Sequence, residues 1–216
     1  MPNWCSNRLT VTGDKQSLTK FKELSLVKSD KGDNLHFTME GLYPTPKALL
    51  DMTSPVMWRG DENDTEGKEA FDKYNSELIN QYGYNDWYNW RVNNWGTKWD
   101  AAESFIADNE DELFSVDYDT AWAPNTAWVQ YVAKLFPTLK FSLVFEEAGM
   151  DFCGLYEVTG DDEELLEGEL EYIDGDSGRK VYYNKDTDKY HYEDDDTIAG
   201  DEDDDFWPET YNPYIN

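Results

Sequence analysis

Four segments in the first 150 residues alternate between apolar and polar side chains with a period of two. They are residues 8–12, 35–39, 114–118 and 141–145. This period gives each segment one apolar face, which is typical of a strand that covers a core on one side only. We therefore expect four half-buried strands, and their order relative to the helices limits the fold to a few choices.

Two helices are predicted between these strands. Asp14 can cap a helix that carries Leu18, Phe21 and Leu24 on one face. The second helix follows Pro124 and has apolar residues at the spacing i, i+3, i+4, i+7 and i+8, namely Trp128, Tyr131, Val132, Leu135 and Phe136. The resulting order, β-α-β-β-α-β, predicts an α+β protein with a ferredoxin-like core, in which two helices cover one face of an antiparallel sheet.

The link between the second and third predicted strands is too long for a simple connection. Residues 45–109 therefore indicate a helical insertion, which starts at Thr45-Pro46. Apolar and aromatic residues at spacings of three and four run through this segment: Phe71, Tyr74, Leu78, Ile79, Tyr82, Tyr84, Tyr88, Val92, Trp95 and Trp99. Gly96 is predicted to interrupt or end the helix. We assign residues 1–160 to a ferredoxin-like domain that contains this insertion.

The chain becomes strongly acidic after residue 150. The whole sequence has a formal net charge of −29, and its last 66 residues hold 23 acidic residues against four basic ones. This composition usually indicates disorder, but the same region holds eleven aromatic residues, which disordered acidic segments rarely contain. We expect a further strand at 152–158, an acidic β-meander at 161–193 with strands at 169–173, 179–184 and 189–193, and an acidic, partly disordered tail at 194–216.

Several sequence blocks resemble a known family. They are Pro2-Asn3-Trp4-Cys5-Ser6-Asn7-Arg8-Leu9, Asn94-Trp95-Gly96-Thr97-Lys98-Trp99-Asp100, Thr120-Ala121-Trp122-Ala123-Pro124 and Glu146-Glu147-Ala148-Gly149, the last followed by Phe152 and Gly154. In this order they resemble the YubB-type ferredoxin-like family of phage and plasmid proteins, apart from Asn125, which stands where a second proline is expected. The resemblance implies an origin in a mobile element and a bacterial host cytoplasm. It implies no catalytic residues.

Few residues suggest chemistry. No nucleophile–base pair and no metal-ligand spacing is visible, so we predict no catalytic residue, no metal site and no cofactor. Cys5 and Cys153 are expected to be reduced, buried thiols. Arg8 is expected to lie close to Asp117 and Asp119, as part of a charge-balanced sheet face. Loose binding of Mg²⁺ or Ca²⁺ by the aspartate runs is expected without a defined site.

Two surfaces are candidates for binding. Trp95, Trp99 and Trp122 could form a pocket between the insertion and the sheet, although such aromatics more often pack as a satellite core. The second surface is the acidic tail, through Asp194, Asp195, Asp196, Asp201, Glu202, Asp203, Asp204 and Asp205, together with Phe206 and Trp207. Direct nucleic-acid binding is not expected, because the predicted open face of the sheet lacks both stacking rings and net positive charge.

The favoured function is that of a non-enzymatic interaction protein. Its acidic part would bind a basic host protein, and it would act as a DNA mimic that inhibits a nucleic-acid-binding or defence protein. Two alternatives stay open: a small-molecule-binding protein or metal-dependent enzyme with a site near the tryptophans, and a structural or assembly module. No leader of basic and then apolar residues is visible, and no apolar run approaches the ~20 residues that a membrane span needs.

Overall fold

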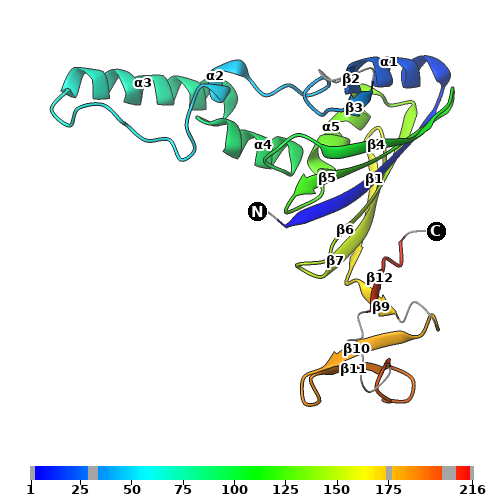
Figure 1. The fold of residues 1–216 in the computed structure, drawn as a ribbon. Helices are drawn as coiled ribbons and strands as arrows, with labels where there is room; N and C mark the ends of the chain where they lie inside the picture. The colour runs from blue at the N-terminus through cyan, green and yellow to red at the C-terminus, as the bar shows by residue number, and fades with distance from the viewer. Residues whose placement is uncertain (1–2, 29–33, 174–176, 201–207, 215–216) are drawn as a thin grey trace.

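The computed structural model describes residues 3–28, 34–173, 177–200 and 208–214. Its centre is a six-stranded, entirely antiparallel sheet with the strand order β4-β5-β1-β6-β7-β8 (Figure 1). The strands are β1 (Trp4–Gly13), β4 (Ala102–Asn109), β5 (Leu113–Ala121), β6 (Leu139–Glu147), β7 (Phe152–Thr159) and β8 (Asp162–Gly168). The predicted strands at 8–12, 114–118, 141–145 and 152–158 all lie within this sheet.

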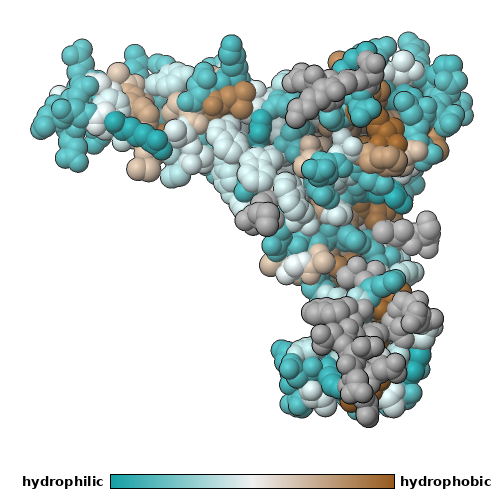
Figure 2. Space-filling model, viewed as in Figure 1, coloured by the Kyte–Doolittle hydropathy of each residue, from teal (hydrophilic) through white to brown (hydrophobic). Residues whose placement is uncertain are grey.

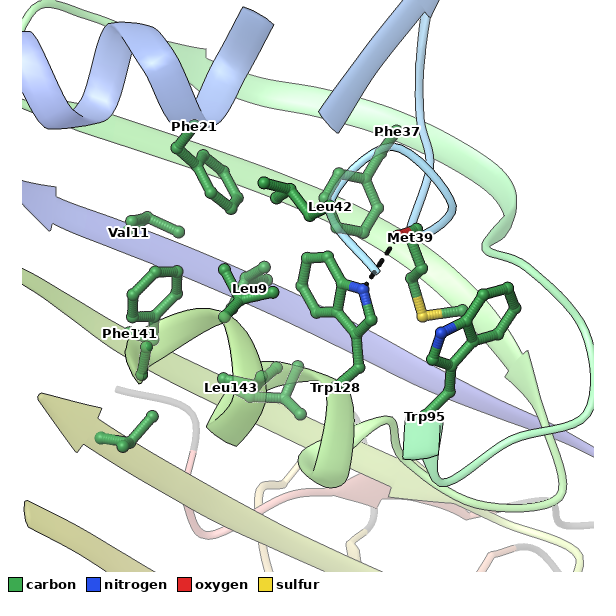
Figure 3. Close-up of a cluster of buried hydrophobic side chains, with 14 of the residues drawn as sticks. Leu9, Val11, Phe21, Phe37, Met39, Leu42, Trp95, Trp128, Phe141 and Leu143 are labelled. Carbon is green, nitrogen blue, oxygen red and sulfur yellow. Dashed lines mark hydrogen bonds between the residues drawn. The ribbon is translucent and has the colours of Figure 1, made fainter. Parts of the chain in front are cut away.

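Helices α1 (Lys15–Ser25) and α5 (Thr126–Leu135) cover one face of the sheet, as predicted. Asp14 caps α1, because its side chain accepts a hydrogen bond from the backbone N–H of Ser17. Between helices and sheet lies an aromatic core, in which Phe21 and Trp128 are fully buried (Figure 3). The indole N–H of Trp128 donates to the carbonyl oxygen of Met39 at 3.0 Å, so even the polar atom of this side chain is satisfied.

One strand of the predicted core was wrong. Residues 35–39 do not join the main sheet: among the described strands, β3 (Leu35–Phe37) pairs with β2 (Leu26–Lys28) alone, in a separate two-stranded sheet. The place beside β5 belongs to β4, which a short turn connects to β5, so the two strands pair as antiparallel neighbours. Two register shifts interrupt β4. These irregularities break the period of two and explain why the sequence pattern did not reveal this strand.

The insertion therefore lies between α1 and β4, and not between the second and third strands of the sheet. The ferredoxin-like order survives as β1-α1-β4-β5-α5-β6. The insertion contains α2 (Lys47–Leu50), α3 (Thr65–Tyr82) and α4 (Trp87–Trp95). Gly83 and Gly96, with φ of 79° and 88°, end α3 and α4 in the left-handed conformation that glycine tolerates best. Helix α3 extends away from the sheet as an arm (Figure 1).

The acidic C-terminal region is built from strands. β8 extends the main sheet at its edge, although its sequence, Asp-Glu-Glu-Leu-Leu-Glu-Gly, has no period of two. A second, four-stranded sheet has the order β11-β10-β9-β12, with β9 (Glu171–Ile173), β10 (Lys180–Asn184), β11 (Lys189–Tyr192) and β12 (Glu209–Tyr211). We call this second sheet the meander sheet. Three of its strands match the predicted ones, and the fourth lies in the segment predicted as a partly disordered tail.

The end of the described chain returns to the main sheet. The buried side chain of Asn212 donates to the carbonyl oxygen of Phe145 on β6 at 3.1 Å. This bond ties the segment after β12 to the main sheet, at the end of β6 where the meander sheet begins. Among the described helices, none combines the length and the apolar character that a membrane crossing requires.

Candidate functional site

Three segments that are far apart in the sequence meet where β1 begins. Trp4 comes from β1, Trp99 follows α4, and Trp122 follows β5. The ring centroids of Trp4 and Trp99 lie 5.9 Å apart. Lys98 fills the space between two of these rings, with its Nζ 3.9 Å from the centroid of Trp99 and 3.6 Å from that of Trp122. We call Trp4, Lys98, Trp99 and Trp122 the tryptophan cluster.

Backbone contacts hold the cluster in place. A Cβ atom on Gly96 would lie 2.7 Å from the carbonyl oxygen of Pro124, so the turn after α4 needs glycine here. The hydroxyl of Thr97 donates to the carbonyl oxygen of Ala121 at 3.0 Å. Trp122 adopts a left-handed φ of 74° and donates its N–H to the carbonyl oxygen of Asn3. A left-handed conformation costs a non-glycine residue about 1–3 kcal/mol, so these contacts must hold it.

The sequence blocks that carried the family resemblance converge at this cluster. The blocks 2–9, 94–100 and 120–124 supply the four cluster residues and the bonds just described. The fourth block lies beside them, since a Cβ on Gly149 would come within 2.6 Å of the side chain of Asn3. Folding therefore brings three of the motifs together at the cluster and places the fourth next to Asn3.

The structure separates the three tryptophans that the sequence suggested as a pocket. Trp95 is fully buried, and its indole N–H donates to the carbonyl oxygen of Tyr43 at 2.9 Å, so this residue belongs to the core. In contrast, 38% of Trp99 and 45% of Trp122 is exposed, together with 40% of Trp4. Trp4 was not among the predicted pocket residues. Its place on the polar side of the first strand was the signal that could have revealed it.

A hollow adjoins the tryptophan cluster on the side of the insertion. It has a volume of about 730 Å³, and its main walls are Pro55, Val56, Trp87, Tyr88, Lys98 and Trp99. Asp86 also lines it, but both of its carboxylate oxygens are occupied by Asn89, one by the backbone N–H at 2.9 Å and one by the amide Nδ2 at 2.7 Å. Ser54, Asn85 and Asn89 also line the hollow, so a ligand would meet ring faces, aliphatic groups, a hydroxyl, side-chain amides and one ammonium. Residues of intermediate hydropathy, drawn in white in Figure 2, gather in the region where α4 meets the sheet.

The acidic candidate residues fall into two groups. Asp194, Asp195 and Asp196 follow β11 and are exposed. Arg179 forms ion pairs with Asp194 and with Asp195, the second at 2.9 Å. Asp196 accepts a hydrogen bond from the hydroxyl of Tyr182. The other predicted residues, Asp201, Glu202, Asp203, Asp204, Asp205, Phe206 and Trp207, lie outside the described residues.

The uncovered face of the main sheet carries the predicted charge-balanced pair. Arg8 on β1 and Asp117 on β5 are opposite each other, and two bonds of 2.7 Å and 3.0 Å join the guanidinium to the carboxylate. These bonds raise the pKa of Arg8. Asp119 accepts a hydrogen bond from the hydroxyl of Ser6 at 3.0 Å. The expectation that Arg8 lies beside a carboxylate of the third predicted strand is therefore confirmed for Asp117, whereas Asp119 pairs with Ser6.

Both thiols are buried, as expected. Cys5 lies on the helix-covered face, where burial raises the pKa of its thiol to about 12. Burial also raises the pKa of Cys153 on β7. Neither side chain is therefore a thiolate near neutral pH. In the described part of the chain, no three His, Cys, Asp or Glu side chains form a group that could hold a metal ion.

Comparison with known proteins identifies the family. The family model described as "Ferredoxin-like domain in Api92-like protein" matches residues 94–211, which is more than half of the chain. Among solved structures, the crystal structure of a protein api92 from Yersinia pseudotuberculosis is similar, with 9% sequence identity and a TM-score of 0.46. The similarity covers 78% of this chain and 98% of that one. No curated protein sequence matches significantly. The matched segment runs from the last turn of α4 to β12, and through it this chain belongs to the family of Api92-like proteins with a ferredoxin-like domain.

Proposed function

We propose that this protein is a non-enzymatic interaction protein of phage or plasmid origin. Its acidic C-terminal region binds a basic surface of a protein in the host cytoplasm, and the target is a nucleic-acid-binding or defence protein that the acidic surface inhibits by imitating DNA. The observation that carries the proposal is that many of the carboxylates stand on ordered strands and turns. A surface of fixed shape can present charges at regular positions.

The exposed acidic side chains are numerous in the described part of this region. Between residues 161 and 196 they are Asp161, Asp162, Glu163, Glu164, Glu167, Glu169, Asp186, Asp188, Glu193, Asp194, Asp195 and Asp196. The basic side chains of the same stretch are Arg179, Lys180, Lys185 and Lys189. The excess of negative charge therefore lies on the surface, where a cationic partner can reach it.

The geometry of β8 supports a patterned array. Every residue of β8 except Gly168 is exposed. Glu164 lies opposite Glu157 of β7, and Glu157 forms an ion pair with Lys140 of β6 at 2.7 Å. Neighbouring strands lie about 4.8 Å apart, and residues on one face of a strand repeat about every 6.6 Å. Duplex DNA carries one charge per about 1.7 Å of its axis, and carboxylates held on neighbouring strands can imitate part of such a charge array.

Tyrosines hold part of the acidic surface in place. The hydroxyl of Tyr182 donates to Asp196, and that of Tyr183 donates to Asp188. These hydrogen bonds to carboxylates raise the pKa of both tyrosines. The two residues are 38% and 46% exposed. Exposed tyrosines next to ordered charges offer the kind of anchor that dominates binding energy in protein interfaces.

The proposal is tested with two full-length variants of equal net charge. The first neutralises the C-terminal surface with Asp162→Asn, Glu164→Gln, Glu167→Gln, Asp186→Asn and Glu193→Gln. The matched control neutralises five exposed acids elsewhere, with Glu23→Gln, Asp51→Asn, Glu62→Gln, Glu69→Gln and Asp72→Asn. The two variants and the unchanged chain are each immobilised and used to capture proteins from a bacterial lysate. The capture is done at low and at high salt, with and without duplex DNA as a competitor.

We expect basic proteins to bind the unchanged chain and the control at low salt. The same proteins should be displaced by DNA and lost from the C-terminal variant. The alternative is that the acidic residues only keep the protein apart from its own copies, as charged side chains on an edge strand commonly do. Equal capture by both variants, or capture that DNA does not compete with, would contradict the proposal in favour of this alternative.

A further inference from the structure

We propose that the hollow beside the tryptophan cluster is a binding site for a small, planar aromatic anion. The site lies between residues 54–56, the first residues of α4 and the turn after α4, on described residues that the acidic C-terminal surface does not include. It is independent of the function proposed above, and each proposal can fail without the other.

The size and walls of the hollow suit a small organic molecule. Its volume of about 730 Å³ falls within the range of about 300–1,000 Å³ that is usual for ligand pockets. Trp87 and Tyr88 enter from α4, Trp99 enters from the tryptophan cluster, and Pro55 and Val56 supply an aliphatic wall. Rings prefer offset stacking or edge-to-face contact with other rings, so three aromatic walls favour a planar ring system over an aliphatic one.

Lys98 supplies the charge that selects an anion. Its ammonium is held between the faces of Trp99 and Trp122, 3.9 Å and 3.6 Å from their centroids. Among the described residues, no carboxylate forms an ion pair with Lys98. Ring faces attract an ammonium but do not accept its hydrogen bonds as an oxygen does, so an incoming carboxylate would find a fixed donor.

The same surroundings disfavour other ligand classes. A cationic ligand would meet the like charge of Lys98, whereas Asp86, the acid of the lining, keeps its charge but is only 1% exposed and offers a ligand almost no surface. A nucleic-acid polymer would be repelled by a protein with a net charge of −29. A single small anion carries too little charge for this repulsion to prevent its binding, above all at physiological salt, where charges beyond about 8 Å are screened.

Three probe molecules separate the roles of the ring and the charge. The probes are 2-naphthoate, 2-naphthamide, which keeps the ring and lacks the charge, and cyclohexanecarboxylate, which keeps the charge and lacks the aromatic ring. Each is titrated into the full chain by isothermal calorimetry. We expect 2-naphthoate to bind at least tenfold more tightly than either of the other two.

Variants of the site then identify the residues responsible. Lys98→Met should weaken the affinity for 2-naphthoate at least tenfold and leave the affinity for 2-naphthamide nearly unchanged. Trp99→Leu should weaken the affinity for both aromatic probes. Lys98→Arg keeps the cation and should retain most of the affinity for 2-naphthoate. Lys47→Met removes an exposed lysine of α2 and serves as the matched control, with affinity unchanged.

Several results would overturn the proposal. Equal affinity for 2-naphthoate and 2-naphthamide in the unchanged chain would show that Lys98 does not select an anion. Equal loss in Lys98→Arg and Lys98→Met would show that the lysine only supports the packing of the tryptophans. Urea unfolding of each variant identifies any that is not folded, and the charge-neutralised C-terminal variant should bind 2-naphthoate as the unchanged chain does. A loss of binding in that variant would place the site on the acidic region instead.

Discussion

The main sheet and the meander sheet use aromatic residues in opposite ways. On the helix-covered face of the main sheet, Phe21 of α1 and Trp128 of α5 are fully buried and contribute apolar area removed from water. In the meander sheet, Tyr182 and Tyr183 are exposed and use their hydroxyls to hold carboxylates. The first arrangement is insensitive to salt, and the second depends on ionised groups. The comparison teaches that aromatic content alone does not indicate a core, because the neighbouring charges decide what a ring does.

Two buried thiols report on these regions separately. Cys5 lies in the core of the main sheet, on the face that the helices cover. Cys153 lies at the junction with the C-terminal region, and its Sγ donates to the carbonyl oxygen of Glu169 at 3.3 Å. Its neighbour across the strand pair is Gly168, which lies against the ring of Tyr214. Opening of the C-terminal region should therefore expose Cys153 before Cys5.

The largest effect is expected from Trp128→Ala. This change removes a fully buried ring from the core, and such a truncation costs about 3–5 kcal/mol in the free energy of unfolding. The loss should be the same at low and at high salt, because apolar burial does not depend on screening. Urea unfolding followed by tryptophan fluorescence measures it, and both thiols should become reactive in the variant. A loss that disappears at high salt would mean that charge, and not burial, stabilises the main sheet.

A smaller and local effect is expected from Asn212→Ala. The buried amide of Asn212 donates to Phe145, and the loss of one such hydrogen bond costs about 0.5–1.5 kcal/mol. We expect the segment after β12 to detach, so that Cys153 reacts faster with a thiol reagent while Cys5 stays protected. Mass spectrometry of the labelled peptides distinguishes the two cysteines. If Cys5 gains reactivity equally, the two regions unfold as one unit and the comparison breaks down.

The smallest expected effect is a shift in the pH at which acid unfolds the meander sheet. Hydrogen bonds from the hydroxyl and backbone N–H of Thr197 lower the pKa of Asp195 in the folded protein. Because the folded pKa is below the unfolded value of about 3.9, this group stabilises the fold above that pH and stops doing so as the pH falls through the folded pKa. Thr197→Val should therefore move the acid transition of the meander sheet to higher pH. Near-ultraviolet circular dichroism of the tyrosines follows it.

The control for the acid prediction is Thr19→Val on α1. The hydroxyl of Thr19 bonds to a backbone carbonyl of its own helix, so this change should leave the acid transition of the meander sheet where it is. A transition that moves equally in both variants would mean that Asp195 has no special part in it.

Most of the fold could be predicted from the pattern of residues. The strands around Leu9, Val116 and Leu143 and the helix around Trp128 have a strong period and lie where expected. The error at 35–39 arose because a good period of two says that a segment is a strand but not which partner it pairs with. β4 and β8 escaped prediction for the opposite reason: bulges in one and a run of acids in the other remove the period, while pairing with a neighbouring strand still makes them strands.

The candidate site could be predicted only in part. Trp99 and Trp122 were singled out because tryptophans near turns are conspicuous, but nothing in the spacing distinguished them from the buried Trp95. The strained φ of Trp122 and the position of Lys98 between two rings depend on contacts between segments more than twenty residues apart. Local sequence cannot encode such contacts in a readable way.

The sequence by itself determined the class of the fold, the positions of the main helices and the acidity of the C-terminal region, because these follow from local period and composition. The tertiary structure alone decided which strand lies beside β5 and which tryptophans reach the surface. It also decided that much of the acidic charge stands on ordered strands. The physical reason is that pairing, burial and the distances between charges depend on residues brought together by folding. The sequence of one segment does not specify which other segment it will contact.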